Sequence, residues 1–381
     1  AFLRAHPRTA IHTWTDQQFI DFIRFKSAYF LTGSIGWPDY HGLIPHGTAF
    51  QMIDWSYQKE QWKRLRKLVP DVKHLMYFHC FIDVLDDADT IYRDARLLTV
   101  DGTQADYGKP HDKIFVPTRE NRYGRDIAKN VELILGPQPE GLGCDGVYWD
   151  ELEYSRYQYH YGDYGRPGEL PWDRVTADID PKTHRIVRLK SSVTLISQPF
   201  RLALAQRILK GNVLVGNGQP HTRTFVDLHF PRFVETGSIS NCAKAQAYTP
   251  IALGDHLTER SEEDAYRVML RALDFGCVYY WYNDLTVIPT HPTLTAYMFP
   301  ITPLELHEGY VIGQERIVTN RSGLFGWGDS SRHEVHVFDD RGREAPDFKA
   351  PTVVRDGKTL TELRLPEDYS AAIVRKRGER E

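Results

Sequence analysis

The stretch Gly143-Cys144-Asp145-Gly146-Val147-Tyr148-Trp149-Asp150-Glu151 is a short apolar run that ends in two adjacent carboxylates and leads into a tyrosine-rich segment. A barrel of βα repeats collects its catalytic groups at the carboxyl ends of its strands. Acids at such an end, beside aromatic rings that stack on sugars, are typical of glycoside chemistry. The alternative is that Asp150 and Glu151 only cap a following helix, as acidic residues after a strand often do.

The same strand-and-helix rhythm continues through the first 300 residues and predicts parallel strands with crossover helices. Eight strand candidates follow one another along the chain: 9–13, 28–32, 74–79, 145–150, 212–217, 232–236, 249–253 and 277–282. This count predicts an α/β fold, a (β/α)8 TIM-like barrel, although the weak first strand leaves seven strands as an alternative.

Three of the intervening helices have readable ends. Ser261 to Asp264 is a capping-box start, and Gly276 is a C′ glycine. The segment 197–210 has one apolar face, with Pro199 expected in the first turn. Apolar residues over 54–69 are spaced to lie on one face of a helix, and this predicted helix ends at Pro70.

We expect the chain to divide into a catalytic barrel over 1–302 and a C-terminal antiparallel β-domain over 303–381. The barrel carries insertions at 84–120 and 154–190, and the second is expected to hold a hairpin of 175–179 and 185–189. Short alternating strands around 333–339, 353–355 and 360–365 predict the β-domain, which we expect to be structural.

Composition excludes several classes of protein. The chain has 381 residues, 41% hydrophobic and 26% charged, with a net charge of -4. It holds no apolar stretch of roughly 18 to 20 residues, so we expect no membrane span. The negative net charge gives no reason to expect binding to nucleic acid. The 12% aromatic content, with 21 Tyr and 8 Trp, fits a carbohydrate partner or a large core.

Four scattered cysteines, Cys80, Cys144, Cys242 and Cys277, are expected to be buried thiols, since their spacing fits neither a zinc site nor a disulfide framework. The chain begins Ala1-Phe2-Leu3 without an initiator Met or a signal-peptide h-region. The compartment is therefore unknown, with an extracellular or periplasmic location favoured. The oligomeric state stays open.

Polar residues close several predicted strands and would face one rim. Asp150 and Glu151 end the fourth strand and Glu235 the sixth. Glycoside hydrolysis needs two carboxyl groups, one protonated to assist the leaving group and one ionised to attack or to activate water. Alternation places Tyr148 and Asp150 on one face of their strand, and Asp145 at the opposite, structural end.

The strand-four and strand-six acids resemble those of α-galactosidase-like and endo-α-N-acetylgalactosaminidase-like retaining glycoside hydrolases. In that family an Asp on strand four is the nucleophile and an acid at strand six is the proton donor. The resemblance is architectural and covers mainly residues 140–240. It implies Asp150 as nucleophile and Glu235 as acid/base, while the adjacent Glu151 leaves the choice of nucleophile open.

Loop residues beyond the strands are candidates for contact with sugar hydroxyls or rings, each against the alternative of local packing. The substrate-binding candidates are Trp37, Asp39, His41, His79, Asp83, Tyr148, Tyr154, Asn217, His221, Asp255, Tyr282 and Asn283.

The prediction is a glycoside hydrolase acting on an oligo- or polysaccharide without an organic cofactor. The alternatives are an inverting enzyme that uses the same acids or Glu151, and a carbohydrate-binding barrel without catalysis. A metal-assisted hydrolase using His221, Asp227 and His229 together with His79 is the least favoured, because the sequence contains neither HExxH nor HxH. We therefore expect no metal.

Overall fold

The computed structural model describes residues 2–5, 15–35, 44–153, 155–166, 168–235, 243, 249–253, 260–281 and 290–376. Its centre is an eight-stranded sheet in which every neighbouring pair is parallel. The strands lie in chain order: β1 (Phe2–Ala5), β2 (Phe30–Ile35), β3 (Lys73–His79), β6 (Gly146–Asp150), β11 (Val213–Asn217), β12 (Arg232–Glu235), β13 (Ile251–Leu253) and β14 (Val278–Tyr280).

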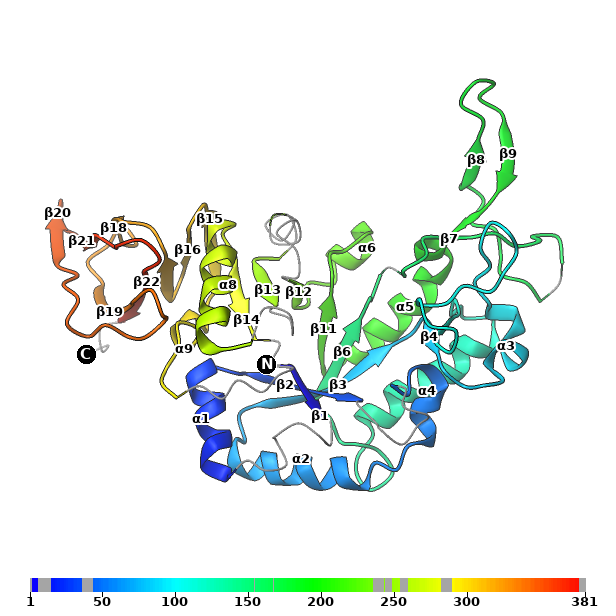
Figure 1. Ribbon diagram of the computed structural model, residues 1–381, viewed down its shortest axis with the longest axis horizontal. Coiled ribbons are helices and arrows are strands. Elements are labelled where there is room, and N and C mark those ends of the chain that lie inside the picture. The colour runs from blue at the N-terminus through cyan, green and yellow to red at the C-terminus, as the bar shows by residue number, and fades with distance from the viewer. Residues whose placement is uncertain are drawn as a thin grey trace.

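The sheet is curled, as Figure 1 shows. Within the described part of the chain no ladder joins β14 back to β1. Seven of the predicted strands are found close to their expected places. The strand that pairs in parallel with β2 is Phe2–Ala5, and the first strand predicted at 9–13 lies outside the described residues.

Helices cover the outer face of this sheet. These helices are α1 (Asp16–Lys26), α2 (Ser56–Leu68), α4 (Arg122–Leu135), α5 (Val193–Leu209) and α8 (Glu262–Asp274). The described chain also contains the shorter helices η2 (Gly47–Met52), α3 (Ala88–Ile91), η3 (Arg93–Ala95), α6 (Arg223–Val226) and α9 (Thr295–Met298).

Helix ends follow the capping residues of the sequence. The Ser261 hydroxyl accepts the Asp264 N–H at 3.0 Å, which is the first half of the predicted capping box, and Gly276 adopts a φ of 67° after α8, as predicted. Helix α5 begins earlier than expected, because Ser192 caps its start by accepting the Leu195 N–H. Pro199 therefore lies inside the helix and not in its first turn.

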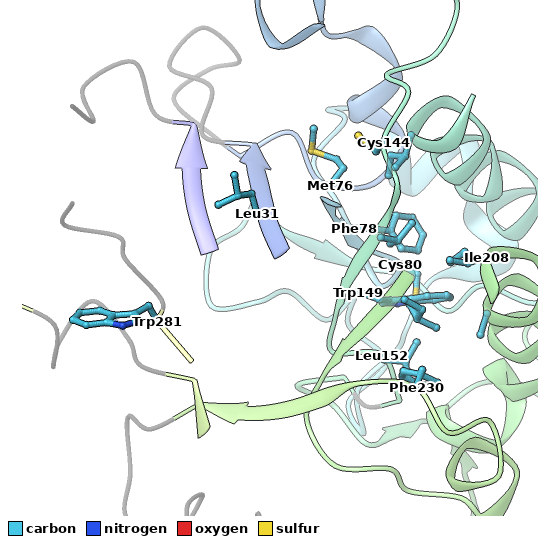
Figure 2. Packing of buried hydrophobic residues seen from close by; sticks show 14 of the residues in the cluster. Leu31, Met76, Phe78, Cys80, Cys144, Trp149, Leu152, Ile208, Phe230 and Trp281 are labelled. Carbon is cyan, nitrogen blue, oxygen red and sulfur yellow. The ribbon is translucent and has the colours of Figure 1, made fainter. Parts of the chain in front are cut away.

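The main core lies between the sheet and the helices. Phe78 and Trp149 are almost fully buried and meet edge to face, with ring centroids 4.9 Å apart. Figure 2 shows Phe78, Cys80 and Trp149 directed toward Ile208 of α5. A smaller apolar cluster, Leu75, Tyr148, Val215 and Phe233, lies on the opposite face of the same strands.

The amino end of β6 is built for close packing. A Cβ on Gly146 would lie 2.1 Å from the carbonyl oxygen of Val213 on β11, so only glycine fits. Asp145 accepts the His74 N–H at 2.9 Å and pairs with Arg66 at 3.3 Å. The structural role predicted for Asp145 is confirmed.

Two insertions rise beside the carboxyl ends of the strands. The first contains β5 (Lys113–Ile114), which pairs with β4 (Ile82–Asp83) directly before the insertion. The second contains the pair β7 (Tyr159–His160) and β10 (Ser191–Ser192), and the expected hairpin, β8 (Ala177–Ile179) and β9 (Ile186–Leu189). Figure 1 shows this hairpin projecting from the same side of the molecule as α6, which follows β11.

The chain from 303 to 376 forms antiparallel sheets. One has the order β15 (Pro303–His307), β16 (Tyr310–Gly313), β17 (Arg316–Thr319), β22 (Ser370–Lys376) and β19 (Arg332–Phe338); the other has the order β18 (Gly323–Phe325), β21 (Lys358–Leu363) and β20 (Thr352–Arg355). The buried Tyr266 of α8 joins them to the rest, since its hydroxyl lies 2.9 Å from the Ser370 hydroxyl.

None of the described helices combines the length and the apolar character needed to cross a bilayer. Cys80, Cys144 and Cys277 are buried, as predicted. Cys242 lies outside the described residues.

Candidate active site

Asp150 ends β6 at the carboxyl edge of the sheet, where it remains partly exposed. The Tyr77 hydroxyl donates to its Oδ2 at 2.8 Å. Asn217, the last residue of β11, donates from Nδ2 to Oδ1 at 2.6 Å, and the Glu151 N–H also reaches Oδ1 at 3.0 Å. Three donors on two strands and one loop therefore hold this carboxylate in one orientation.

Opposing influences act on the acidity of Asp150. Burial raises its pKa above the ordinary value for Asp, and the negative charge of Glu151 acts in the same direction. His79 and the hydrogen bonds from Tyr77 and Asn217 lower it, but burial dominates. Burial also raises the pKa of Tyr77 well above 10, so this phenol keeps its proton and acts as a donor.

Glu151 is buried, with 6% of its surface exposed, and has a left-handed φ of 47°. The Tyr107 hydroxyl donates to its Oε1, while His79 Nε2 lies 3.2 Å from its Oε2. His79 Nδ1 accepts the N–H groups of Phe81 and Ile82, so the ring proton is on Nε2 and points at Glu151. Each carboxylate oxygen of Glu151 therefore accepts a hydrogen bond, one from Tyr107 and the other from His79.

Glu153 holds the loop that follows β11 in place. It is fully buried and pairs with Arg232 of β12 at 2.6 Å. Its other oxygen accepts the N–H groups of His221 and Thr222 and the Thr222 hydroxyl. The loops that follow β6 and β11 are therefore tied to the first residue of β12 through one buried carboxylate.

Three predicted substrate contacts have other roles in the structure. Asp83 is fully buried, and its oxygens accept the Thr48 N–H and hydroxyl and the Leu85 N–H, so it holds η2 in place. Tyr148 is stacked between Tyr77 and Phe233, with ring centroids 5.7 and 5.4 Å away, which leaves no face for a sugar. His79 is 3% exposed, and its Nε2 hydrogen-bonds to Glu151.

Asn217 and His221 lie at the expected rim, but in different settings. Asn217 is 5% exposed and bound to Asp150, so it orients the carboxylate. His221 is an exposed loop residue whose backbone N–H binds Glu153, and burial of part of its ring lowers its pKa.

Glu235 is the last residue of β12, opposite Leu253 of β13 in the ladder, and its side chain lies outside what the structure describes. The predicted contacts that lie wholly outside the described residues are Trp37, Asp39, His41, Tyr154, Asp255, Tyr282 and Asn283.

Sequence reasoning missed Tyr77 and Tyr107. The signal for Tyr77 was present, since it stands two residues before His79 on a predicted strand and pairs with Tyr148 in the ladder. Tyr107 belongs to the 84–120 insertion, and nothing in its local pattern indicates that it reaches Glu151.

The described residues contain no group of three or more His, Cys, Asp or Glu side chains arranged to hold a metal ion. A largely apolar cavity of about 80 Å³ lies at the amino ends of the strands, where Phe30 of β2, Arg232 of β12 and Ile251 of β13 line it.

Neither a protein-family model nor a curated protein matches the sequence. Among solved structures, an α-amylase from H. orenii aligns over 99% of both chains at 10% identity, with a TM-score of 0.50. A debranching enzyme from Nostoc punctiforme aligns over 95% of this chain and 88% of that one at 10% identity, with a TM-score of 0.46. An α-L-fucosidase isoenzyme 2 from Paenibacillus thiaminolyticus covers 74% of this chain and 45% of that one at 12% identity, with a TM-score of 0.42. At such identity the likeness to the α-amylase is one of fold.

Proposed function

We propose that the protein is a retaining glycoside hydrolase in which Asp150 attacks the anomeric carbon and Glu235 protonates the leaving oxygen. The observation that carries the proposal is the setting of Asp150. This carboxylate is partly open at the carboxyl edge of a curled parallel sheet, and donors from Tyr77, Asn217 and the Glu151 backbone orient both of its oxygens. An oriented, accessible carboxylate is what nucleophilic attack on a sugar requires.

Glu151 is the less suitable nucleophile or acid. Its side chain is buried, and both of its oxygens accept hydrogen bonds from Tyr107 and His79. A carboxyl group that only accepts has no proton to give to a leaving group. We assign it the role of fixing the loop that follows Asp150 and of holding the 84–120 insertion through Tyr107.

The assignment of Glu235 rests on its place in the chain and on the family resemblance. It ends β12, two strands along from β6, and catalytic residues of parallel barrels come from the carboxyl ends of several strands. In the proposed cycle Glu235 first gives its proton to the leaving oxygen and then takes one from the water that releases the sugar.

The remaining parts of the proposal concern architecture and substrate. We infer a closed (β/α)8 barrel over 1–302 and a separate β-domain over 303–381. The α-amylase is a fold neighbour that acts on glycosidic bonds, which supports an oligo- or polysaccharide substrate. An enzyme of the α-galactosidase type is the specific form that the strand-four and strand-six acids favour.

The test is hydrolysis of a broad glycan panel by the wild type, Asp150→Asn and Glu235→Gln. The matched control is Asp145→Asn, which changes the same residue type at the opposite end of β6. We expect wild type and the control to cleave the same glycan, and both site variants to lose at least about 10³-fold in kcat/KM while remaining folded. Binding of a glycan without turnover by the wild type would identify a carbohydrate-binding barrel instead.

Product stereochemistry tests the mechanism separately. NMR of the first-formed sugar should show the anomeric configuration of the substrate, because two displacements restore it. A product of opposite configuration would make Asp150 a general base in an inverting enzyme.

A further inference from the structure

The hairpin of β8 and β9 stands apart from the rest of the molecule in Figure 1. We refer to residues 174–190 as the arm. Every residue from 181 to 189 is exposed. A two-stranded hairpin alone is marginally stable in water, because neither of its faces is covered. The arm therefore has the form of an element that packs against something outside its own chain.

Large aliphatic side chains on the arm face solvent. Val175 is 73% exposed, Ile179 59%, Ile186 61% and Val187 64%. Four such residues within thirteen positions make an apolar surface of a kind that marks interaction sites on soluble proteins. Branched aliphatic side chains offer no flat face for a sugar ring, so this surface suits a protein partner better than a glycan.

The arm is also basic. It contains five basic and two acidic side chains. Lys190 pairs with Asp178, and Arg188 donates to the carbonyl oxygen of Val100. Arg174, Lys182 and Arg185 make no ion pair with any residue that the structure describes, so their charges are available to a partner.

The neighbouring insertion has the complementary charge. Residues 84–120 contain eight acidic and five basic side chains. Val100, which belongs to this insertion, is 59% exposed and adds an apolar contact. The bond from Arg188 to Val100 places the base of the arm against this insertion in the same chain.

We propose that the arm is the contact surface of a homodimer, in which it packs on the acidic 84–120 insertion of a second copy. Because the arm and this insertion are adjacent, a two-fold axis close to them lays each arm over the insertion of the other copy. Such an interface is isologous and closed, so it produces a dimer and not a filament. In such a dimer the basic arm of each copy faces the acidic insertion of the other, so the same electrostatic attraction acts at two symmetric places.

The experiment is sedimentation velocity and light scattering of the full chain over a broad range of concentration. The wild type is expected to show twice the 44.1 kDa mass of one chain. Ile179→Ser/Val187→Ser should weaken self-association at least about tenfold, because the central apolar contacts of an interface dominate its stability. Arg185→Glu should weaken it too, and more strongly at low salt than at high salt.

The matched control is Val354→Ser on β20, since Val354 is 70% exposed but far along the chain from the arm. It should leave the mass and the concentration dependence unchanged. Amide hydrogen exchange within 174–190 should slow as the protein concentration rises.

Three results would overturn the proposal. The first is a wild type that stays monomeric at all concentrations, and the second is a dimer that the arm variants leave intact. The third is loss of glycan binding in the arm variants without any change of mass, which would make the arm a glycan contact. These measurements need no substrate turnover, so they are independent of the proposed hydrolase activity.

Discussion

Asn217 and Asp150 lie 67 residues apart in the chain, yet Asn217 Nδ2 donates to Asp150 Oδ1 at 2.6 Å. The bond joins the carboxyl ends of β11 and β6, which are neighbours in the parallel sheet. The opposite oxygen of Asp150 is held by Tyr77 from β3. Three adjacent strands therefore converge on one carboxylate, and its acidity is the property that mutation should change most directly.

Replacing Tyr77 by Phe removes one donor from Asp150 without removing the ring. Loss of a hydrogen bond to the charged form should raise the pKa of Asp150, so the acid limb of the kcat/KM profile should move to higher pH. The profile is measured on the substrate found by the glycan panel. Tyr164→Phe, whose hydroxyl binds the His160 carbonyl oxygen, is the control and should leave the limb in place.

Replacing Glu151 by Gln should have the opposite effect. The charge of Glu151 raises the pKa of Asp150, so its removal should lower that pKa and move the acid limb to lower pH. Gln keeps the shape and one acceptor oxygen of Glu151. If the acid limb of the kcat/KM profile moves to higher pH in both Tyr77→Phe and Glu151→Gln, Asp150 is not the group that titrates.

Gly146→Ala should destabilise the sheet at the start of β6. The added Cβ would lie 2.1 Å from the Val213 carbonyl oxygen and would push β6 and β11 apart. We expect a loss of about 2 to 3 kcal/mol in the free energy of unfolding, measured in urea. Gly165→Ala has its nearest neighbour at 3.9 Å and should change that free energy by less than about 0.5 kcal/mol.

Arg232→Met should leave Glu153 as a buried charge without its ion-pair partner. The expected cost in the free energy of unfolding is about 3 to 5 kcal/mol, because removing one member of a buried pair exposes the full desolvation penalty of the other. Arg232→Met combined with Glu153→Gln should recover part of this loss. Equal stability of the single and double variants would contradict the pairing.

Two buried histidines should make the protein less stable in acid. Burial lowers the pKa of both His74 and His160 to about 4, against an ordinary value of 6.5. The unfolded chain therefore takes up protons first, so the stability that these neutral rings contribute is complete above pH 6.5 and is lost as the pH falls toward 4. Each contributes up to about 3 kcal/mol.

Denaturant unfolding at several pH values checks this. His74→Phe should flatten the pH dependence, because both ring nitrogens of His74 lack a hydrogen-bond partner in the described structure and its ring packs on Trp62. His184→Gln, at an exposed position in the arm, should leave the dependence unchanged. If the free energy of unfolding of His74→Phe depends on pH between 6.5 and 4 as steeply as that of the wild type, His74 is not a source of the acid sensitivity.

Local chemistry in the sequence determined much of the fold. Seven strands, the capped start of α8 at Ser261, the hairpin of the second insertion and the structural role of Asp145 could all be predicted, because hydrophobic period, caps and turns act over a few residues. The first strand could not be predicted, since Phe2–Ala5 is too short to show a hydrophobic periodicity and is defined by its pairing with β2.

The candidate site divides in the same way. The sequence alone placed Asp150, Asn217 and Glu235 at strand ends, because parallel strands bring their carboxyl ends to one edge. Only the tertiary structure decided that Asn217 and Tyr77 orient Asp150, that Tyr107 and His79 hydrogen-bond to Glu151, and that Asp83 and Tyr148 are buried. These outcomes depend on contacts between segments dozens of residues apart, whose geometry is set when the insertions fold onto the sheet and not by the pattern within any one segment.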